Sequence, residues 1–108
     1  MTVNELISTG YFKPVSLPSP NREIVGAYVG DLLSWVMGRA EADNAWITIM
    51  SNVNVIAVAT LTDVSCVILA EGVSLDGEVL SVALEKGVNV LSCELPLYEA
   101  AIKLGGMI

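Results

Sequence analysis

From Ile24 onward the sequence repeats one pattern: a short apolar run, a turn of Gly, Asp, Ser or Asn, and a stretch with the apolar spacing of a helix. The apolar runs begin near Ile24, Ala45, Val64 and Val88, so that one unit takes roughly 20 residues. Consecutive strand and helix units of this kind form a parallel sheet through right-handed crossovers. The pattern predicts a three-layer α/β fold, with a mostly parallel sheet built from about four short units.

The composition supplies enough apolar side chain for such a sheet. Hydrophobic residues make up 54% of the chain and charged residues only 16%, with a mean hydropathy of +0.66. This excess suits strands buried on both faces, and it also suits a surface that a second copy covers. The longest apolar runs, residues 55–59 and 64–70, fall short of the about 18 residues that a membrane span needs. With no signal-like start, the sequence predicts a cytoplasmic protein that makes no use of a membrane.

The first 23 residues do not follow the repeat. Thr2 and Glu5 have the spacing of a capping box, which predicts a short helix that ends at Gly10. Three prolines between residues 11 and 22 indicate an extended segment and loop, which either adds an edge strand to its own sheet or reaches a second subunit. We expect residues 1–108 to form one domain, with this helix and loop in residues 1–23 and the repeated units in residues 24–108.

The side chains that most enzymes use for proton transfer are scarce. The chain has no histidine, which removes the commonest general base and the commonest zinc ligand. It has no glycine-rich phosphate loop and no Cys-x-x-Cys pair, while Cys66 and Cys93 lie in apolar runs, as buried small residues do. A net charge of −7, with five scattered basic residues, leaves no basic track for a nucleic acid. The sequence therefore predicts no catalytic machinery, no metal, no cofactor and no nucleic-acid partner.

The four turns that follow the predicted strands form the candidate binding site. In a parallel sheet these turns all emerge at the carboxyl edge, where open α/β sheets bind their ligands. The site residues predicted in this way are Gly30, Asp31, Ser51, Asn52, Glu71, Gly72 and Ser92. Their mixture of amides and carboxylates favours a hydroxyl- or amine-bearing ligand, or a partner's cation, over a bare phosphate. Asp, Ser and Asn are also ordinary helix caps, and on that interpretation Asp31 and Ser74 begin the first and third helices of the repeat.

An interface is predicted from the aromatic residue of the first repeated helix. The inward face of that helix is assigned to its other apolar residues, Leu32, Leu33, Val36, Met37 and Ala40. Trp35 therefore lies near the edge of the apolar stripe, where a partly exposed tryptophan serves as an interface anchor. Together with the large apolar content, this favours a homodimer in which Trp35 takes part.

Several blocks of the sequence resemble stand-alone DRTGG-domain proteins. The first block is residues 25–37 (VGAYVGDLLSWVM), and later blocks follow in register over nearly the whole chain: residues 46–49, 52–59, 67–72 and 88–92. The motif that names the family is not present, and its Gly-Gly strand end corresponds here to Glu71-Gly72.

The resemblance implies an α/β fold, a tendency to dimerise and a regulatory role. Related domains are attached to phosphotransacetylases and to CBS-containing pyrophosphatases that respond to adenine nucleotides, and stand-alone members occur near genes for iron-only hydrogenases and for signalling. Some carry the label of a serine kinase of the phosphocarrier protein HPr, which a chain without a phosphate loop or catalytic base does not support. We expect a non-catalytic regulatory or adaptor domain that binds an adenine nucleotide or a protein partner; the alternative is a structural, dimerising subunit of a redox or signalling assembly.

Overall fold

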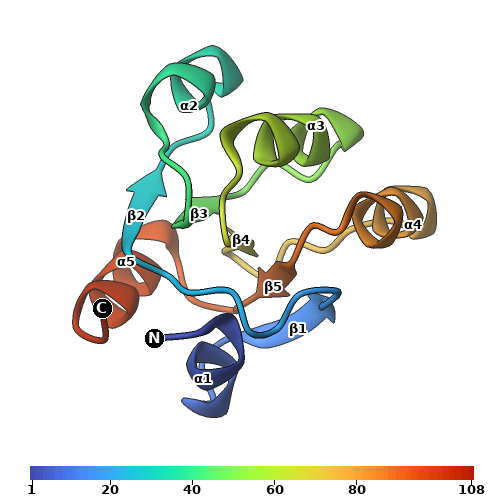
Figure 1. Ribbon diagram of the computed structural model, residues 1–108. Coiled ribbons are helices and arrows are strands. Elements are labelled where there is room, and N and C mark those ends of the chain that lie inside the picture. The colour runs from blue at the N-terminus through green and yellow to red at the C-terminus, as the bar shows by residue number, and fades with distance from the viewer.

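A five-stranded mixed sheet lies between two layers of helices in the computed structural model, which describes residues 1–108 (Figure 1). In chain order the elements are α1 (Val3–Ser8), β1 (Lys13–Ser16), β2 (Gly26–Val29), α2 (Leu33–Arg39), β3 (Asn44–Thr48), α3 (Val53–Thr62), β4 (Cys66–Leu69), α4 (Gly77–Lys86), β5 (Val90–Ser92) and α5 (Leu97–Gly105). No helix combines the length and the apolar character that crossing a membrane requires.

The strand order across the sheet is β1-β5-β4-β3-β2. Strands β2 to β5 are parallel to one another, and β1 pairs antiparallel with β5, with Lys13 opposite Ser92. The predicted α/β fold class is confirmed. The extended N-terminal segment adds an edge strand to its own sheet, where Pro14 is tolerated because an edge strand leaves one side without a ladder.

Each face of the sheet has its own hydrophobic core. Strands β2 to β5 follow one another in the sheet in chain order, so every right-handed crossover places its helix on the same face. Helices α2, α3 and α4 cover that face, where Trp46 is completely buried among residues of α3 and α4 (Figure 1). Helices α1 and α5 cover the opposite face, over Ala45 and Ile47 of β3.

Short-range capping signals set most helix ends. The Thr2–Glu5 capping box forms as predicted, with the Glu5 N–H donating to Thr2 Oγ1 (3.1 Å) and the Thr2 N–H to Glu5 Oε1 (2.8 Å). The prediction that Ser74 caps α4 is wrong: the cap is Asp76, whose Oδ1 accepts from the Val79 N–H at 2.9 Å. A carboxylate at this position also interacts favourably with the helix dipole, which a serine hydroxyl does only weakly.

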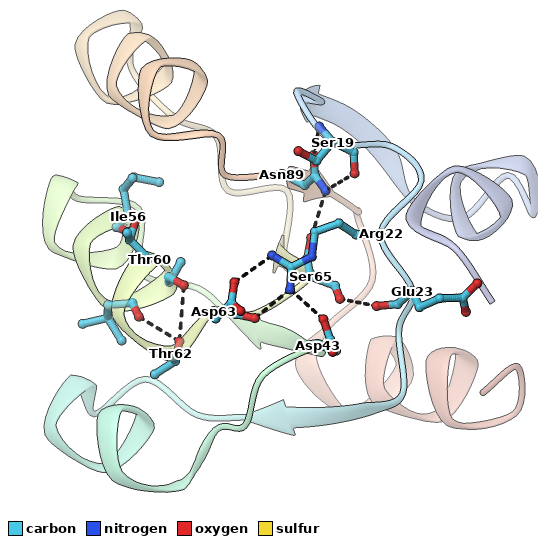
Figure 2. A network of polar contacts seen from close by, with 12 residues as sticks. Ser19, Arg22, Glu23, Asp43, Ile56, Thr60, Thr62, Asp63, Ser65 and Asn89 are labelled. Carbon is cyan, nitrogen blue, oxygen red and sulfur yellow. Dashed lines mark hydrogen bonds and ion pairs between the residues drawn. The ribbon is translucent and has the colours of Figure 1, made fainter.

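The amino edge of the sheet is closed by a polar network (Figure 2). Arg22 donates from Nη2 to Asp43 Oδ1 (2.7 Å) and from Nη1 to Asp63 Oδ1 (2.9 Å). Partial burial lowers the pKa of the Arg22 guanidinium, but its hydrogen bonds to the two carboxylates outweigh burial and raise the pKa above its ordinary value. Asn89 donates to the Ser19 carbonyl at 2.7 Å and holds the loop after β1 in place. These polar contacts therefore tie the amino edge together.

Candidate functional site

The seven predicted site residues lie at the carboxyl edge of the sheet, because β2 to β5 are parallel and end there. Strand β1 runs the other way, so its first residue, Lys13, lies at the same edge beside Ser92. The Gly30–Asp31 turn is at the β2 end of this edge and Ser92 is at the β5 end. The structure brings the predicted residues to one edge but spreads them along its length.

Asp31 ties two strand ends together. Its Oδ1 accepts from Thr48 Oγ1 at 2.6 Å and from the Ile49 N–H at 3.0 Å, both at the end of β3. The prediction that Asp31 caps α2 is wrong, since Leu32 occupies the N-cap position and makes no side-chain capping bond. The Asp31 carboxylate instead accepts hydrogen bonds from two donors at the end of the neighbouring strand β3.

The two middle turns of the edge are also engaged within the protein. Asn52 Oδ1 caps α3 by accepting from the Asn54 N–H at 2.9 Å, next to the half-buried Ser51. The N–H groups of Glu71 and Gly72 donate to the carbonyls of Leu95 and Cys93, both at 2.9 Å. These amides are therefore already occupied and do not point to a ligand.

Position 72 requires a glycine. Its φ is +70°, a left-handed conformation that side chains disfavour. A Cβ at this position would also lie 2.7 Å from Glu94 Oε2. The two loops that carry Gly72 and Glu94 therefore pack directly against each other, which fixes one wall of the adjacent hollow.

An open hollow of about 220 Å³ lies at the β1–β5 end of the carboxyl edge. Its lining comes from the segment before and within β1 and from the loop after β5: Gly10, Tyr11, Lys13, Ser92, Cys93, Glu94 and Leu95. Of the predicted site residues, only Ser92 contributes to this lining. We call this feature the carboxyl-edge hollow.

Two lysines give the carboxyl-edge hollow its positive charge. Lys13 lines it and makes no ion pair, and Lys103 lies next to it, with Nζ 3.4 Å from the Tyr11 hydroxyl and 4.4 Å from the centroid of the Tyr11 ring. Glu94 is the acidic residue of the lining. Sequence reasoning missed Tyr11, Lys13 and Lys103, because the pairing of β1 with β5 joins segments that are far apart in the chain.

Neither cysteine is prepared for nucleophilic chemistry. Burial raises the pKa of the Cys66 thiol to about 12. Burial raises the pKa of Cys93 as well, reinforced by the charge of Glu94 and opposed by a hydrogen bond with the Leu95 backbone. Both thiols are free, and no three acidic, cysteine or histidine side chains lie close enough together to hold a metal ion. The hollow thus offers binding groups and no activated nucleophile.

Trp35 is exposed, and so are residues that the sequence assigned to the core. Trp35 is 53% exposed, with the Arg39 guanidinium 3.7 Å from its ring centroid. Leu32 and Met37 are 61% and 51% exposed, so their predicted inward orientation is wrong. Helix α2 covers the sheet next to the edge strand β2 and has a helical neighbour, α3, on one side only, which leaves Val36 as its one fully buried residue.

No family model matches the sequence, and no curated protein matches it. Among solved structures, the chain is similar to the CBS and DRTGG domains of the regulatory region of a Clostridium perfringens pyrophosphatase, which was crystallised with its activator diadenosine tetraphosphate. The TM-score is 0.69 and the sequences are 13% identical, over 92% of this chain and 43% of that chain. The chain thus has less than half the length of that regulatory region, and at this identity the likeness establishes a shared α/β fold.

Proposed function

We propose that this chain is a regulatory domain of the DRTGG type that binds an adenine nucleotide at the carboxyl-edge hollow, works as a homodimer in the cytoplasm and carries out no chemistry itself. The observation that carries the proposal is the pair of lysines, Lys13 and Lys103, beside an open hollow in a chain of net charge −7. Positive charge held in a concave site attracts an anionic ligand even when the protein as a whole is acidic.

The related structure supports the same class of ligand. Part of that regulatory region has a similar fold, and the region was crystallised with a dinucleotide activator. The carboxyl-edge hollow, at about 220 Å³, is smaller than typical sites for whole drug-sized ligands. It therefore suits the phosphate and ribose of a nucleotide, with phosphate oxygens beside Lys13 and Lys103 and sugar hydroxyls within reach of Ser92.

The hydrogen bonds of Asp31 weaken the argument that the sequence made against a phosphate-bearing ligand. The sequence favoured a hydroxyl- or amine-bearing ligand because Asp31 and Glu71 appeared to make the edge acidic. Asp31 instead accepts two hydrogen bonds from β3, and the hollow lies at the opposite end of the edge. The charged residues at or beside the hollow are Lys13, Lys103 and Glu94, with Glu71 in the loop that packs against Leu95.

Thermal shift and calorimetric titration with AMP, ATP and diadenosine tetraphosphate test this proposal. At a hundredfold excess over its Kd, a nucleotide should stabilise the protein by about 2.7 kcal/mol, and Lys13→Ala should weaken binding about tenfold. Lys86→Ala is the matched control, since it removes the same charge from α4 and should leave binding unchanged. The proposal fails if no nucleotide stabilises the wild-type chain, or if both variants weaken binding equally.

The exposed apolar residues of α2 favour a second candidate, a structural subunit that dimerises through this helix. Leu32 and Trp35, three positions apart and so on one side of α2, are each more than half exposed, and exposed apolar residues on one helix face are typical of interaction surfaces. Light scattering should then show a dimer that Trp35→Asp dissociates. A dimer without any nucleotide-dependent stabilisation would favour this candidate over the regulatory one.

A further inference from the structure

A groove between α3 and α4 is the larger of the two hollows in the molecule, at about 450 Å³. Five of its seven lining residues are hydrophobic, and the full lining is Val53, Ile56, Ala57, Thr60, Leu61, Val82 and Lys86. This volume and an apolar wall with few polar groups are typical of sites for small molecules. We call it the α3–α4 groove.

The α3–α4 groove is polar at one end only. Both helices run from the carboxyl edge to the amino edge of the sheet, because each connects one parallel strand to the next. Thr60 lies in the last turn of α3 and Lys86 is the last residue of α4, whereas Val53 begins α3 at the other end. The distance along the helix from Val53 to Leu61 is about 12 Å. The groove therefore offers an apolar length with a cation at one end.

Lys86 is the residue of the groove that would bind a negatively charged group of a ligand. The Thr60 hydroxyl already donates to the Ile56 carbonyl at 2.9 Å, so it has no proton for a ligand (Figure 2). Lys86 makes no ion pair and no hydrogen bond, and α3 carries no charged residue. The nearest acid along α3, Asp63, is held by Arg22, and Glu85 precedes Lys86 in the chain without lining the groove. An unpaired ammonium beside an apolar groove complements one negative charge on an apolar ligand.

We propose that the α3–α4 groove binds a free medium-chain carboxylic acid, with the alkyl chain along α3 and the carboxylate beside Lys86. A length of about 12 Å accommodates a medium chain, whereas a long acyl chain would extend beyond it. The proposal is independent of nucleotide binding, because the groove shares no residue with the carboxyl-edge hollow.

Titration of isotope-labelled protein with octanoate, decanoate, 1-decanol and decylamine, each below its micelle concentration, tests the proposal. Decanoate should shift the amide resonances of Ala57, Thr60 and Val82, bind about tenfold more tightly than octanoate, and bind more tightly than the alcohol or the amine. Lys86→Ala should weaken the binding of decanoate about threefold and leave the affinity for decanol unchanged. Lys13→Ala, the matched control, should change neither affinity.

Ala57→Asp provides a second variant, at an exposed position that tolerates a polar side chain. A carboxylate there should abolish decanoate binding while the remaining spectrum stays that of the folded protein. The proposal is overturned if millimolar decanoate causes no shifts in the groove, or if Lys86→Ala affects decanoate and decanol equally. It is also overturned if the wild-type chain is a dimer that Ala57→Asp converts to a monomer, because a second copy would then occupy the groove.

Discussion

Replacing Asp31 with alanine should destabilise the protein, although Asp31 lies in the edge where ligands of this fold class bind. The Asp31 carboxylate accepts from Thr48 Oγ1 (2.6 Å) and from the Ile49 N–H (3.0 Å), and it thereby fastens the end of β2 to the end of β3. Strand β2 is an edge strand, and its end is also held to β3 by the Gly30 N–H, which donates to the Ile47 carbonyl (3.2 Å), and by Trp46 Nε1–H, which donates to the Gly30 carbonyl (2.9 Å). Replacing Asp31 should therefore weaken this attachment without abolishing it.

The size of the loss follows from the burial of the two partners. Hydrogen bonds to a charged group contribute roughly 1.5–3 kcal/mol each, but Asp31 is only half-buried, so solvent screening reduces that figure. The Thr48 side chain is completely buried, and its hydroxyl would lose its acceptor. We expect Asp31→Ala to lower the free energy of unfolding by about 2 kcal/mol and Tm by about 10 °C.

Urea denaturation followed by tryptophan fluorescence measures this loss. Asp31→Asn, which retains an acceptor oxygen but no charge, should cost about half as much, and Glu85→Ala, on the exposed side of α4, should change stability by less than about 0.5 kcal/mol. Nucleotide affinity, measured at a temperature where all variants are folded, should not change. If Asp31→Ala keeps wild-type stability and loses nucleotide binding, the assignment of Asp31 to structure rather than to the ligand is refuted.

Three further predictions follow from the buried groups and one helical glycine. Burial raises the pKa of Cys66 from 9.0 to about 12, so the stability that the buried thiol contributes is complete below pH 9 and falls as the pH rises toward 12. Between pH 8 and pH 10.5 the free energy of unfolding, measured by urea titration, should therefore fall by about 2 kcal/mol more in the wild type than in Cys66→Ala. Asn89→Ala should cost about 3 kcal/mol in the same assay, because the buried amide joins the carbonyls of Ser19 and Ser65, whereas the exposed Asn54→Ala should cost little. Gly38→Ala should raise Tm by a few degrees, since Gly38 lies inside α2 with open space where its Cβ would be; unchanged or lower stability would contradict this.

Short-range signals in the sequence predict the fold well. The alternation of strands and helices and the Thr2–Glu5 capping box depend on residues a few positions apart, and both form as expected. The parallel direction of β2 to β5 follows from the strand–helix–strand crossovers, and their right-handedness places α2, α3 and α4 on one face because the strands progress in one direction across the sheet. Local pattern therefore accounts for the layers and for the location of the carboxyl edge.

Long-range pairing accounts for what the sequence could not predict. Asp31 has cap-like spacing to α2, yet its partners are 17 and 18 residues away on β3, where two donors compete successfully for the carboxylate. The carboxyl-edge hollow depends on Lys13 lying opposite Ser92, a pairing that the prolines of the segment left open. The apolar residues of α2 recur with the spacing of a helix, and the helix forms as predicted. Several of them stay exposed, because α2 lies at the end of its layer and has only one neighbouring helix to cover them.

The distribution of positive charge makes the two binding proposals separable. Arg22 is fixed in the closed amino edge between Asp43 and Asp63, and Arg39 lies on Trp35, so neither is free to recognise a ligand. Lys13 and Lys103 lie at the carboxyl-edge hollow, Lys86 lines the α3–α4 groove, and none of these three lysines makes an ion pair. Replacing either Lys13 or Lys86 with alanine makes the chain more acidic by the same unit, so long-range electrostatic effects on an anion are nearly equal in the two variants. A nucleotide whose affinity falls with Lys13→Ala but not with Lys86→Ala, and a carboxylic acid that shows the reverse, must therefore be responding to local contacts in two different sites.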